Sequence, residues 1–318
     1  MMIESICPEC QKPFKASDKD VGRVYVCKQC GIECIVPSLK INPGDRFGRY
    51  EVQYPLGSGA SSEVHLAVNV ETNEHVALKI LFVDESTTLD IKRFFRESKN
   101  ASTLDHPGLI RIYEMGSEDD LHYLAMEYVD GQTLDKFLED HGALSEIDAL
   151  SVARDVAAVL EYAWEEKELV HRDIKPSNMM LSYDGRTKLM DLGIAKSLMY
   201  DVTQLTEEDT ILGTPIYMSP EQCAPGKPIN FHADIYALGA TLFHLVTNRY
   251  PYTGNSPMDL VRKHLFSKVP DPREFRPDLH EHTVHLIQKM MAKRVSQRPE
   301  TWGDVIRSAD HAIQLLTD

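Results

Sequence analysis

Four cysteines near the start of the chain have the spacing of a metal site. They form two pairs, Cys7 with Cys10 and Cys27 with Cys30, with two residues inside each pair and 16 between the pairs. One tight turn can present two thiolates to an ion, and two such turns complete the tetrahedral ligand set of Zn²⁺. We therefore predict a structural Zn²⁺ site in a zinc ribbon. Two disulfides are the alternative, which a reducing compartment disfavours.

A glycine pair and a lysine further along the chain could hold phosphate groups. Gly57 and Gly59 precede residues 63–68, Glu-Val-His-Leu-Ala-Val, which read as a strand. Backbone N–H groups of a glycine loop can approach phosphate oxygens, and a dinucleotide-binding motif would continue into a helix instead. Lys79 lies 22 residues after Gly57 in a second strand-like stretch, residues 75–81. A lone strand lysine is usually a surface residue, but this position after a glycine loop favours a phosphate-binding role.

The glycine pair and the lysine belong to a longer series of motifs. In chain order they are Gly57-x-Gly59, Val76-Ala77-Leu78-Lys79, Glu97 on a helical stretch, residues 171–178 (His-Arg-Asp-Ile-Lys-Pro-Ser-Asn), Asp191-Leu192-Gly193 and Ser219-Pro220-Glu221. This set resembles the motifs of the eukaryotic-like (Hanks-type) Ser/Thr protein kinases of bacteria, over about residues 47–316. The chain departs from that pattern at Ser62, Leu192 and Ser219. None of the three departures removes a phosphate, metal or base group.

The resemblance implies a set of catalytic residues. Asp173 would accept the proton of the substrate hydroxyl, and Lys175 would offset the growing charge on the γ-phosphate. Asn178 and Asp191 would hold two Mg²⁺ ions through oxygen ligands. Lys175 and Thr214 match residues that mark Ser/Thr members of the family, so the resemblance implies Ser/Thr rather than Tyr substrates.

The resemblance also implies an ATP site. Lys79 would contact the α- and β-phosphates, and Glu97 would fix its orientation. Backbone groups at a hinge would bind adenine, apolar side chains would sandwich the ring, and one methionine would guard the deeper pocket. With the glycine loop, these further residues are Leu56, Gly57, Ser58, Gly59, Val64, Ala77, Met126, Glu127, Val129 and Met180. Asp234 would brace the catalytic loop, and Glu221 and Arg298 would form a buried ion pair.

Control by phosphorylation is a further expectation. Arg172, next to the catalytic aspartate, matches an arginine that often pairs with a phosphate on the activation segment, residues 191–221 here. That segment contains Thr203, Thr206 and Thr210. A phosphate adds up to two negative charges and three strong acceptors, which could order the segment on the arginine. We expect autophosphorylation there, with Thr206 or Thr210 favoured. The alternative is that the acidic residues 207–209 already supply the charge.

These residues need a particular fold to bring them together. The resemblance implies an α+β, bilobal protein kinase fold, with a small β-rich N-lobe that carries one key helix and a larger α-helical C-lobe, preceded by the zinc ribbon. The predicted boundaries are 1–37 for the ribbon, 38–47 for a linker, 48–127 for the N-lobe and 128–318 for the C-lobe.

Composition limits the class of protein. The chain has 318 residues and a net charge of −15, while residues 1–40 hold six Lys/Arg and five Asp/Glu. An acidic body disfavours nucleic acid as a partner, because such binding needs a basic footprint. The N-terminus lacks the apolar stretch of a secretory signal, and no run of 18 apolar residues suggests a membrane span. We expect a cytoplasmic protein without membrane contact.

The sequence favours an ATP-dependent protein serine/threonine kinase that acts on Ser/Thr hydroxyls of protein substrates. A nucleotide-binding pseudokinase or scaffold with a zinc-ribbon interaction module is the alternative. The retained Lys79, Glu97, Asp173, Asn178 and Asp191 argue against it. A docking partner for the ribbon is compatible with either interpretation. The sequence does not identify the substrate protein, the upstream signal or the oligomeric state.

Overall fold

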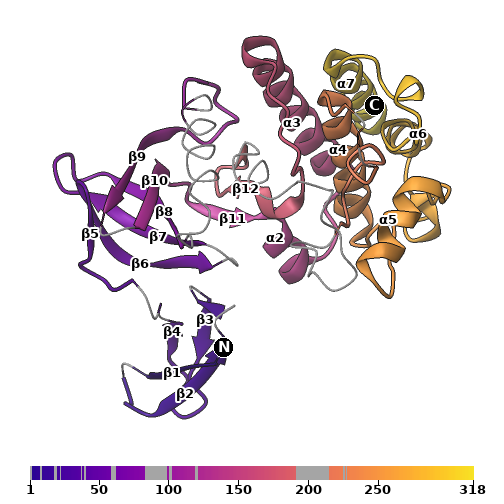
Figure 1. Ribbon diagram of the computed structural model, residues 1–318. Helices are drawn as coiled ribbons and strands as arrows, with labels where there is room; N and C mark the ends of the chain where they lie inside the picture. Colours follow the sequence, from indigo (N-terminus) through magenta and orange to yellow (C-terminus); the bar gives the residue numbers. More distant parts are fainter. Residues whose placement is uncertain are drawn as a thin grey trace. The chain divides into compact units, whose positions relative to one another are not determined.

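The structure is a computed structural model of the chain. It describes residues 2–7, 9–17, 20–21, 23–36, 38, 41–58, 62–82, 99, 102–118, 121–190, 215–224, 226 and 228–318. The chain divides into two compact units, one made of Met1–Ser102 with Arg111–Val129 and the other of Thr103–Ile110 with Asp130–Asp318. Figure 1 shows that the first contains the strands β1 to β10 and the second the labelled helices.

The N-terminal segment contains two small antiparallel sheets. Strand β1 (Met2–Ile6) pairs with β2 (Pro13–Ser17), and β3 (Val24–Val26) pairs with β4 (Glu33–Ile35). The ring of Phe14 stacks on the ring of Tyr25, with centroids 4.2 Å apart. Among the described residues of this part, these rings and a few small buried side chains form the apolar core. So small a core gives little stability, which is the situation in which a structural metal matters most.

A six-stranded antiparallel sheet forms the rest of the first unit. Its strand order is β5-β6-β7-β8-β10-β9. The strands are β5 (Arg46–Phe47), β6 (Tyr50–Ser58), β7 (Ser62–Asn69), β8 (His75–Leu81), β9 (Ile112–Glu118) and β10 (Leu121–Glu127). Strand β8 has the bounds predicted from the sequence. Side chains on one face of the sheet, including Leu78, Ile80 and Ala125, pack together in a buried apolar core.

Helices dominate the second unit. They are α2 (Leu134–His141), α3 (Glu146–Lys167), α4 (Phe231–Thr247), α5 (Pro257–Phe266), α6 (Glu281–Met290) and α7 (Trp302–Thr317). Short 3₁₀ helices span Pro176–Asn178, Pro272–Glu274 and Val295–Gln297. A three-stranded sheet joins β11 (Gly131–Thr133), β12 (Met179–Ser182) and β13 (Thr187–Leu189).

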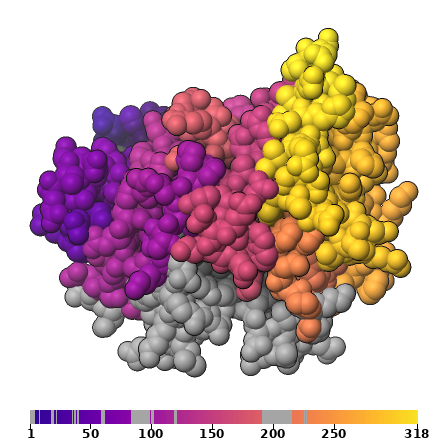
Figure 2. Space-filling model, turned by 90° about the horizontal axis from the view of Figure 1, so that it is seen from above, coloured from indigo at the N-terminus to yellow at the C-terminus, as the bar shows by residue number. Residues whose placement is uncertain are grey.

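Helix α4 lies at the centre of the second unit. It is buried along almost its whole length, and it packs against both α3 and α6. A helix that is apolar all round is stable only when other elements cover it. Helix α7 packs along α3, and its residues, yellow in Figure 2, lie at the surface of the unit. A capping box between Thr301 and Asp304 starts α7 at Trp302.

The predicted fold class is confirmed: a β-rich N-terminal region precedes a helical C-terminal region. No helix in the described part of the chain combines the length and the apolar character that crossing a membrane requires.

Candidate active site

The predicted catalytic loop is anchored from beneath by a buried carboxylate. Asp234, in the first turn of α4, accepts hydrogen bonds from the backbone N–H groups of His171 (2.6 Å) and Arg172 (2.7 Å). Burial raises the pKa of Asp234, and the two N–H donors partly oppose that rise. Arg172 adopts a left-handed backbone conformation, with φ of 65°. A non-glycine residue pays a steric penalty there, so these bonds hold the loop in a strained shape.

Three predicted catalytic residues meet within hydrogen-bond distance. Lys175 Nζ lies 3.0 Å from Asp173 Oδ2, and Asn178 Nδ2 donates to the same oxygen at 3.1 Å. Asn178 Nδ2 also donates to the backbone oxygen of Asp173 at 2.7 Å. Both bonds use the amide nitrogen, so Oδ1 of Asn178 lies on the opposite side of the amide group, where it can serve as a metal ligand. The Asp173 side chain remains 19% exposed, enough for a substrate to reach it.

His171 has a positioning role that the sequence motif alone did not reveal. Its Nε2 lies 2.9 Å from the backbone oxygen of Met190, and its Nδ1 accepts from the backbone N–H of Asp173 at 3.2 Å. A carbonyl can only accept, so Nε2 carries the proton. The neutral ring therefore ties the loop to the strand end just before the predicted metal-binding Asp191. The ring is completely buried, and no pattern of neighbouring residues could have signalled these long-range partners.

In the first unit, strand register gathers the predicted nucleotide-binding side chains on one face. Lys79 on β8 is directly opposite Val64 on β7 and Leu124 on β10, and Ala77 is opposite Met126. Directly opposed residues in antiparallel strands point to the same side of the sheet. Val64, Ala77, Lys79 and Met126 therefore share the face opposite the apolar core. Gly57 is opposite Val64 at the mouth of the β6–β7 turn.

The other nucleotide-site residues have the following positions. Leu56 and Ser58 lie on β6, and Met180 lies on β12 in the second unit. Glu127 ends β10, and its N–H donates to Arg111 O at 2.8 Å, so only its carbonyl remains for adenine. Val129 follows and is buried. The predicted residues Gly59, Glu97, Asp191, Thr203, Thr206, Thr210 and Thr214 lie outside the described residues.

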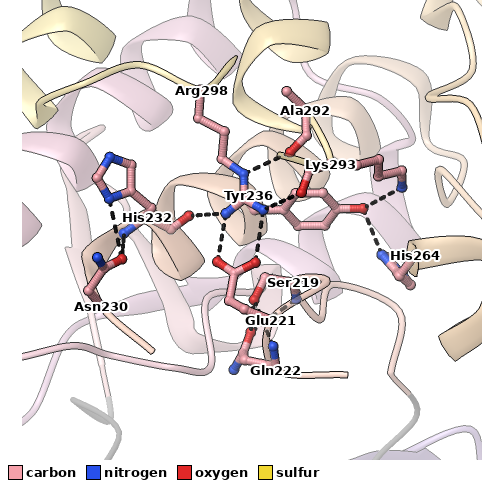
Figure 3. Close-up of polar contacts among 10 residues, drawn as sticks. All are labelled: Ser219, Glu221, Gln222, Asn230, His232, Tyr236, His264, Ala292, Lys293 and Arg298. Carbon is pink, nitrogen blue, oxygen red and sulfur yellow. Dashed lines mark hydrogen bonds and ion pairs between the residues drawn. The ribbon is translucent and has the colours of Figure 1, made fainter. Parts of the chain in front are cut away.

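A buried ion pair fixes Glu221, the last residue of the predicted activation segment. Figure 3 shows the Arg298 guanidinium facing the Glu221 carboxylate, with nitrogen–oxygen distances of 2.7 and 2.8 Å. Burial alone would raise the pKa of Glu221, but the hydrogen bonds and charge of Arg298 outweigh it and lower that pKa. Gln222, the next residue, donates to Arg172 O at 2.9 Å. The ion pair fixes Glu221, and the neighbouring Gln222 therefore connects the end of this segment to the catalytic loop.

The four paired cysteines converge in the N-terminal segment. All four sulfur atoms lie within 4.8 Å of one another, with Cys7–Cys30 and Cys10–Cys27 each at 3.6 Å. The sulfurs of a tetrahedral zinc site lie about 3.8 Å apart when each Zn–S bond is about 2.3 Å. An S–S bond of about 2.05 Å is far shorter, and the cysteines are free thiols. The structure thus favours the metal site over the disulfide alternative.

The two cysteine turns have the same backbone geometry. In each, the N–H of the residue four positions after the first cysteine donates to that cysteine's carbonyl, at 2.9 Å for Gln11 and 2.8 Å for Gly31. Both residues have positive φ, 56° and 74°. Backbone N–H groups of Cys30 and Gln29 lower the pKa of Cys27 to about 6, which favours the thiolate. Cys34 lies in β4 with its sulfur 3.4 Å from Tyr25 O, and it belongs to the small apolar core.

The structure combines a β-sheet unit, a helical unit, an anchored His-Arg-Asp loop and a buried Glu–Arg pair. The family model for the protein kinase domain matches residues 50–310. The chain belongs to the protein kinase domain family.

Three similar curated proteins are from bacteria. The chain is 37% identical over 259 residues to the serine/threonine-protein kinase PrkC of Bacillus subtilis, which covers 81% of this chain and 39% of PrkC. It is 33% identical over 283 residues to the serine/threonine-protein kinase PknB of Mycolicibacterium smegmatis, covering 85% of this chain and 45% of PknB. A probable serine/threonine-protein kinase of Clostridium perfringens is 34% identical over 259 residues, 81% of this chain and 37% of its own. The chain thus spans about two fifths of the length of these relatives.

Proposed function

We propose that this chain is a serine/threonine protein kinase that transfers the γ-phosphoryl group of Mg-ATP to protein Ser/Thr hydroxyls. The observation that carries the proposal is the Asp173 carboxylate, held by Lys175 and Asn178 on a loop that Asp234 braces. Phosphoryl transfer depends mainly on positioning and on neutralising charge. A carboxylate fixed by a lysine and an amide suits that task, and the names of the relatives agree with it.

In the proposed reaction, each residue has one role. The substrate hydroxyl donates a hydrogen bond to Asp173, which takes its proton as the oxygen bonds to the γ-phosphorus and the bond to the β-phosphate oxygen breaks. Lys175 moves from Asp173 towards the γ-phosphate and offsets its charge. Lys79, oriented by Glu97, binds the α- and β-phosphates. Asn178 and Asp191 would hold Mg²⁺, which would neutralise charge on the phosphates.

For the nucleotide, we propose that the face containing Val64, Ala77 and Met126 covers adenine from one side and that Met180 covers it from the other. The Glu127 carbonyl and the Val129 N–H would bind the ring edge. Leu56, Gly57, Ser58 and Gly59 would cover the phosphates, and Thr214 would steady Asp173 and Lys175. The boundaries 1–37, 38–47, 48–127 and 128–318 remain the proposed division into ribbon, linker and two lobes.

The test is transfer of label from Mg-[γ-³²P]ATP to a mixture of Ser/Thr peptides. We expect phosphoserine and phosphothreonine products with the wild type and a loss of at least about 100-fold in Asp173→Asn, because the base is removed. Asp184→Asn, at an exposed hairpin where Asp184 pairs with Arg186, is the matched control and should retain activity. Equal incorporation by wild type and Asp173→Asn would favour the pseudokinase alternative.

We further propose that phosphorylation of the activation segment controls the enzyme. The support is Arg172, the residue before the catalytic aspartate in the chain, and the threonines at 203, 206 and 210. Mass mapping after incubation with Mg-ATP should find phosphate at Thr206 or Thr210. Phosphate confined to residues outside 197–214 would contradict this proposal.

We also propose that Cys7, Cys10, Cys27 and Cys30 bind one structural Zn²⁺. The support is their 4.8 Å grouping and the two matched turns, which together offer four sulfur ligands for one ion. Because this segment has a core of only a few residues, metal binding would supply much of its folding free energy.

A further inference from the structure

Each cysteine pair of the N-terminal segment lies in the turn of its own β-hairpin. Cys7 and Cys10 lie between β1 and β2, and Cys27 and Cys30 lie between β3 and β4. A backbone hydrogen bond across the base of each turn, 2.9 Å in the first and 2.8 Å in the second, closes the turn on its own hairpin. The four sulfur atoms, which we call the four-sulfur group, therefore meet where two separate hairpins approach each other.

Apolar contacts between the two hairpins are limited to a small core. The Phe14 ring of β2 stacks on the Tyr25 ring of β3, and small buried side chains surround this stack. Buried apolar surface of this extent gives little stability. The four-sulfur group is the other place where the hairpins meet, so the chemistry of the sulfurs decides how firmly the hairpins are connected.

The sulfur contacts run from one hairpin to the other. Cys7 Sγ lies 3.6 Å from Cys30 Sγ, and Cys10 Sγ lies 3.6 Å from Cys27 Sγ. Because an S–S bond is about 2.05 Å long, each of these pairs needs to close by only about 1.5 Å to form a disulfide. A disulfide within one turn would leave the two hairpins without a connection through sulfur. Disulfides in the observed pairing would instead preserve that connection without a metal ion.

Solvent reaches one member of the group directly. Cys30 is exposed and Cys10 is partly exposed, whereas Cys7 and Cys27 are 1% and 4% exposed. An accessible sulfur can be oxidised by peroxide to a sulfenic acid, which a neighbouring thiolate converts to a disulfide. The Cys30 sulfur, which meets the oxidant, has the buried Cys7 sulfur at 3.6 Å as such a neighbour.

We propose that the four-sulfur group is an oxidant-sensitive site that exchanges zinc ligation for two disulfides, Cys7–Cys30 and Cys10–Cys27. The inference rests on the proposed Zn²⁺ site. The Cys30 thiolate attacks one oxygen of hydrogen peroxide, the O–O bond breaks, and the other oxygen takes a proton and leaves as water. The Cys7 thiolate then attacks the Cys30 sulfur, the S–O bond breaks, and the second oxygen takes a proton and leaves as water.

The second pair reacts with a second molecule of peroxide. Each disulfide transfers two electrons from its sulfurs to one peroxide, so four thiolates, two peroxides and four protons yield two disulfides and four waters. Loss of the thiolate ligands releases the ion to solution, because a disulfide sulfur does not replace a thiolate as a zinc ligand. A dithiol reductant restores the thiolates by exchange, and Zn²⁺ can then bind again.

The test uses the full chain loaded with Zn²⁺, before and after addition of hydrogen peroxide. Released zinc is measured with a colorimetric chelator, and free thiols and the intact mass are measured on the same sample. We expect a loss of one Zn²⁺ and four thiols per chain. The mass of the metal-free chain should fall by about 4 Da, the four hydrogens lost on forming two disulfides. Dithiothreitol followed by Zn²⁺ should restore all three values.

Peptide mapping without reduction identifies the pairing. Cleavage after glutamate and after basic residues places each of the five N-terminal cysteines on a different peptide. The expected linked peptides join Cys7 to Cys30 and Cys10 to Cys27, while Cys34 stays a free thiol. Cys34→Ser is the matched control, because Cys34 is buried nearby but does not belong to the four-sulfur group, and it should give the same pairing and the same zinc release.

The outcomes separate this inference from the metal site on which it rests. Disulfides within the turns, Cys7–Cys10 and Cys27–Cys30, would overturn the pairing, and retention of zinc and of all thiols in peroxide would overturn the oxidant sensitivity. Zinc removal by a chelator without peroxide is the reference, and it should leave all six cysteines as thiols. Absence of zinc from the untreated chain would instead contradict the proposed metal site itself.

Discussion

The buried pair between Glu221 and Arg298 provides the sharpest stability prediction. The Arg298 side chain is 0% exposed and that of Glu221 is 7% exposed. Besides the carboxylate, the guanidinium donates to the backbone oxygens of Ala292 (2.8 Å) and His232 (2.7 Å). Arg298→Met leaves the carboxylate and these two carbonyls buried without that donor. We expect a large loss of stability.

The size of the expected loss in unfolding free energy follows from the burial of both side chains. Removing one partner of a buried ion pair costs about 3–5 kcal/mol of unfolding free energy, because the other charge stays desolvated. For a unit of this size, 1 kcal/mol shifts Tm by about 2–4 °C, so Arg298→Met should lower Tm by about 6–20 °C. The double variant Glu221→Met/Arg298→Met removes the stranded charge and should recover part of the loss.

Arg307→Met is the matched control. Arg307 also contacts a carboxylate, that of Asp304, at 2.7 Å, but the two side chains are 72% and 37% exposed. Such pairs contribute about 0.2–1 kcal/mol at most. Thermal and urea unfolding of the three variants measures the difference. Equal destabilisation by Arg298→Met and Arg307→Met would refute the reasoning, because then burial would not decide the strength of the pair.

The same pair predicts a dependence on pH. The pKa of Glu221 is lowered in the folded protein from its ordinary value of 4.5. A carboxyl with a lowered folded pKa stabilises the protein above its unfolded pKa, and that stabilisation is lost as the pH falls through the folded value. The stability gap between wild type and Arg298→Met should therefore be largest near pH 7 and should narrow below about pH 4.5. A gap that widens towards acid pH would contradict this sign.

Two further predictions concern the metal site and the catalytic loop. Elemental analysis should find one Zn²⁺ per chain, lost in Cys27→Ser and retained in Cys34→Ser, because only Cys27 belongs to the four-sulfur group; zinc lost equally from both variants would contradict the assignment. Asp234→Asn removes the charge that receives two N–H donors and should lower kcat by about 10-fold or more, with KM for ATP little changed. Wild-type kcat in a folded Asp234→Asn variant would show that the hydrogen bonds of Asp234 to the catalytic loop are not needed for catalysis.

Local patterns predicted the elements that local interactions determine. A lysine flanked by apolar residues, after the glycine loop, placed β8 at residues 75–81. The two tight turns expected from the cysteine spacing are present, and each is closed by a residue with positive φ, Gly31 and Gln11. Glycine adopts such a φ without steric cost, whereas glutamine gives no such signal in the sequence.

Contacts between distant segments could not be predicted in the same way. The resemblance identified Asp173 and Asp234, but it did not show that His171 joins Asp173 to Met190. The hydrogen bond from Gln222 to the backbone oxygen of Arg172 likewise joins residues 50 positions apart in the chain. Such contacts depend on how helices pack, and a single sequence shows only which side of each helix is apolar.

The most direct measurement of the central claim separates nucleotide binding from phosphoryl transfer. Mg-ATP affinity and the single-turnover transfer rate are measured on wild type and Asp173→Asn at saturating nucleotide. Because Asp173 is proposed to act on the hydroxyl and not on ATP, we predict equal affinity within about threefold and a transfer rate at least about 100-fold lower in Asp173→Asn. Unchanged transfer in a variant that still binds Mg-ATP would contradict the assignment of Asp173 as the base.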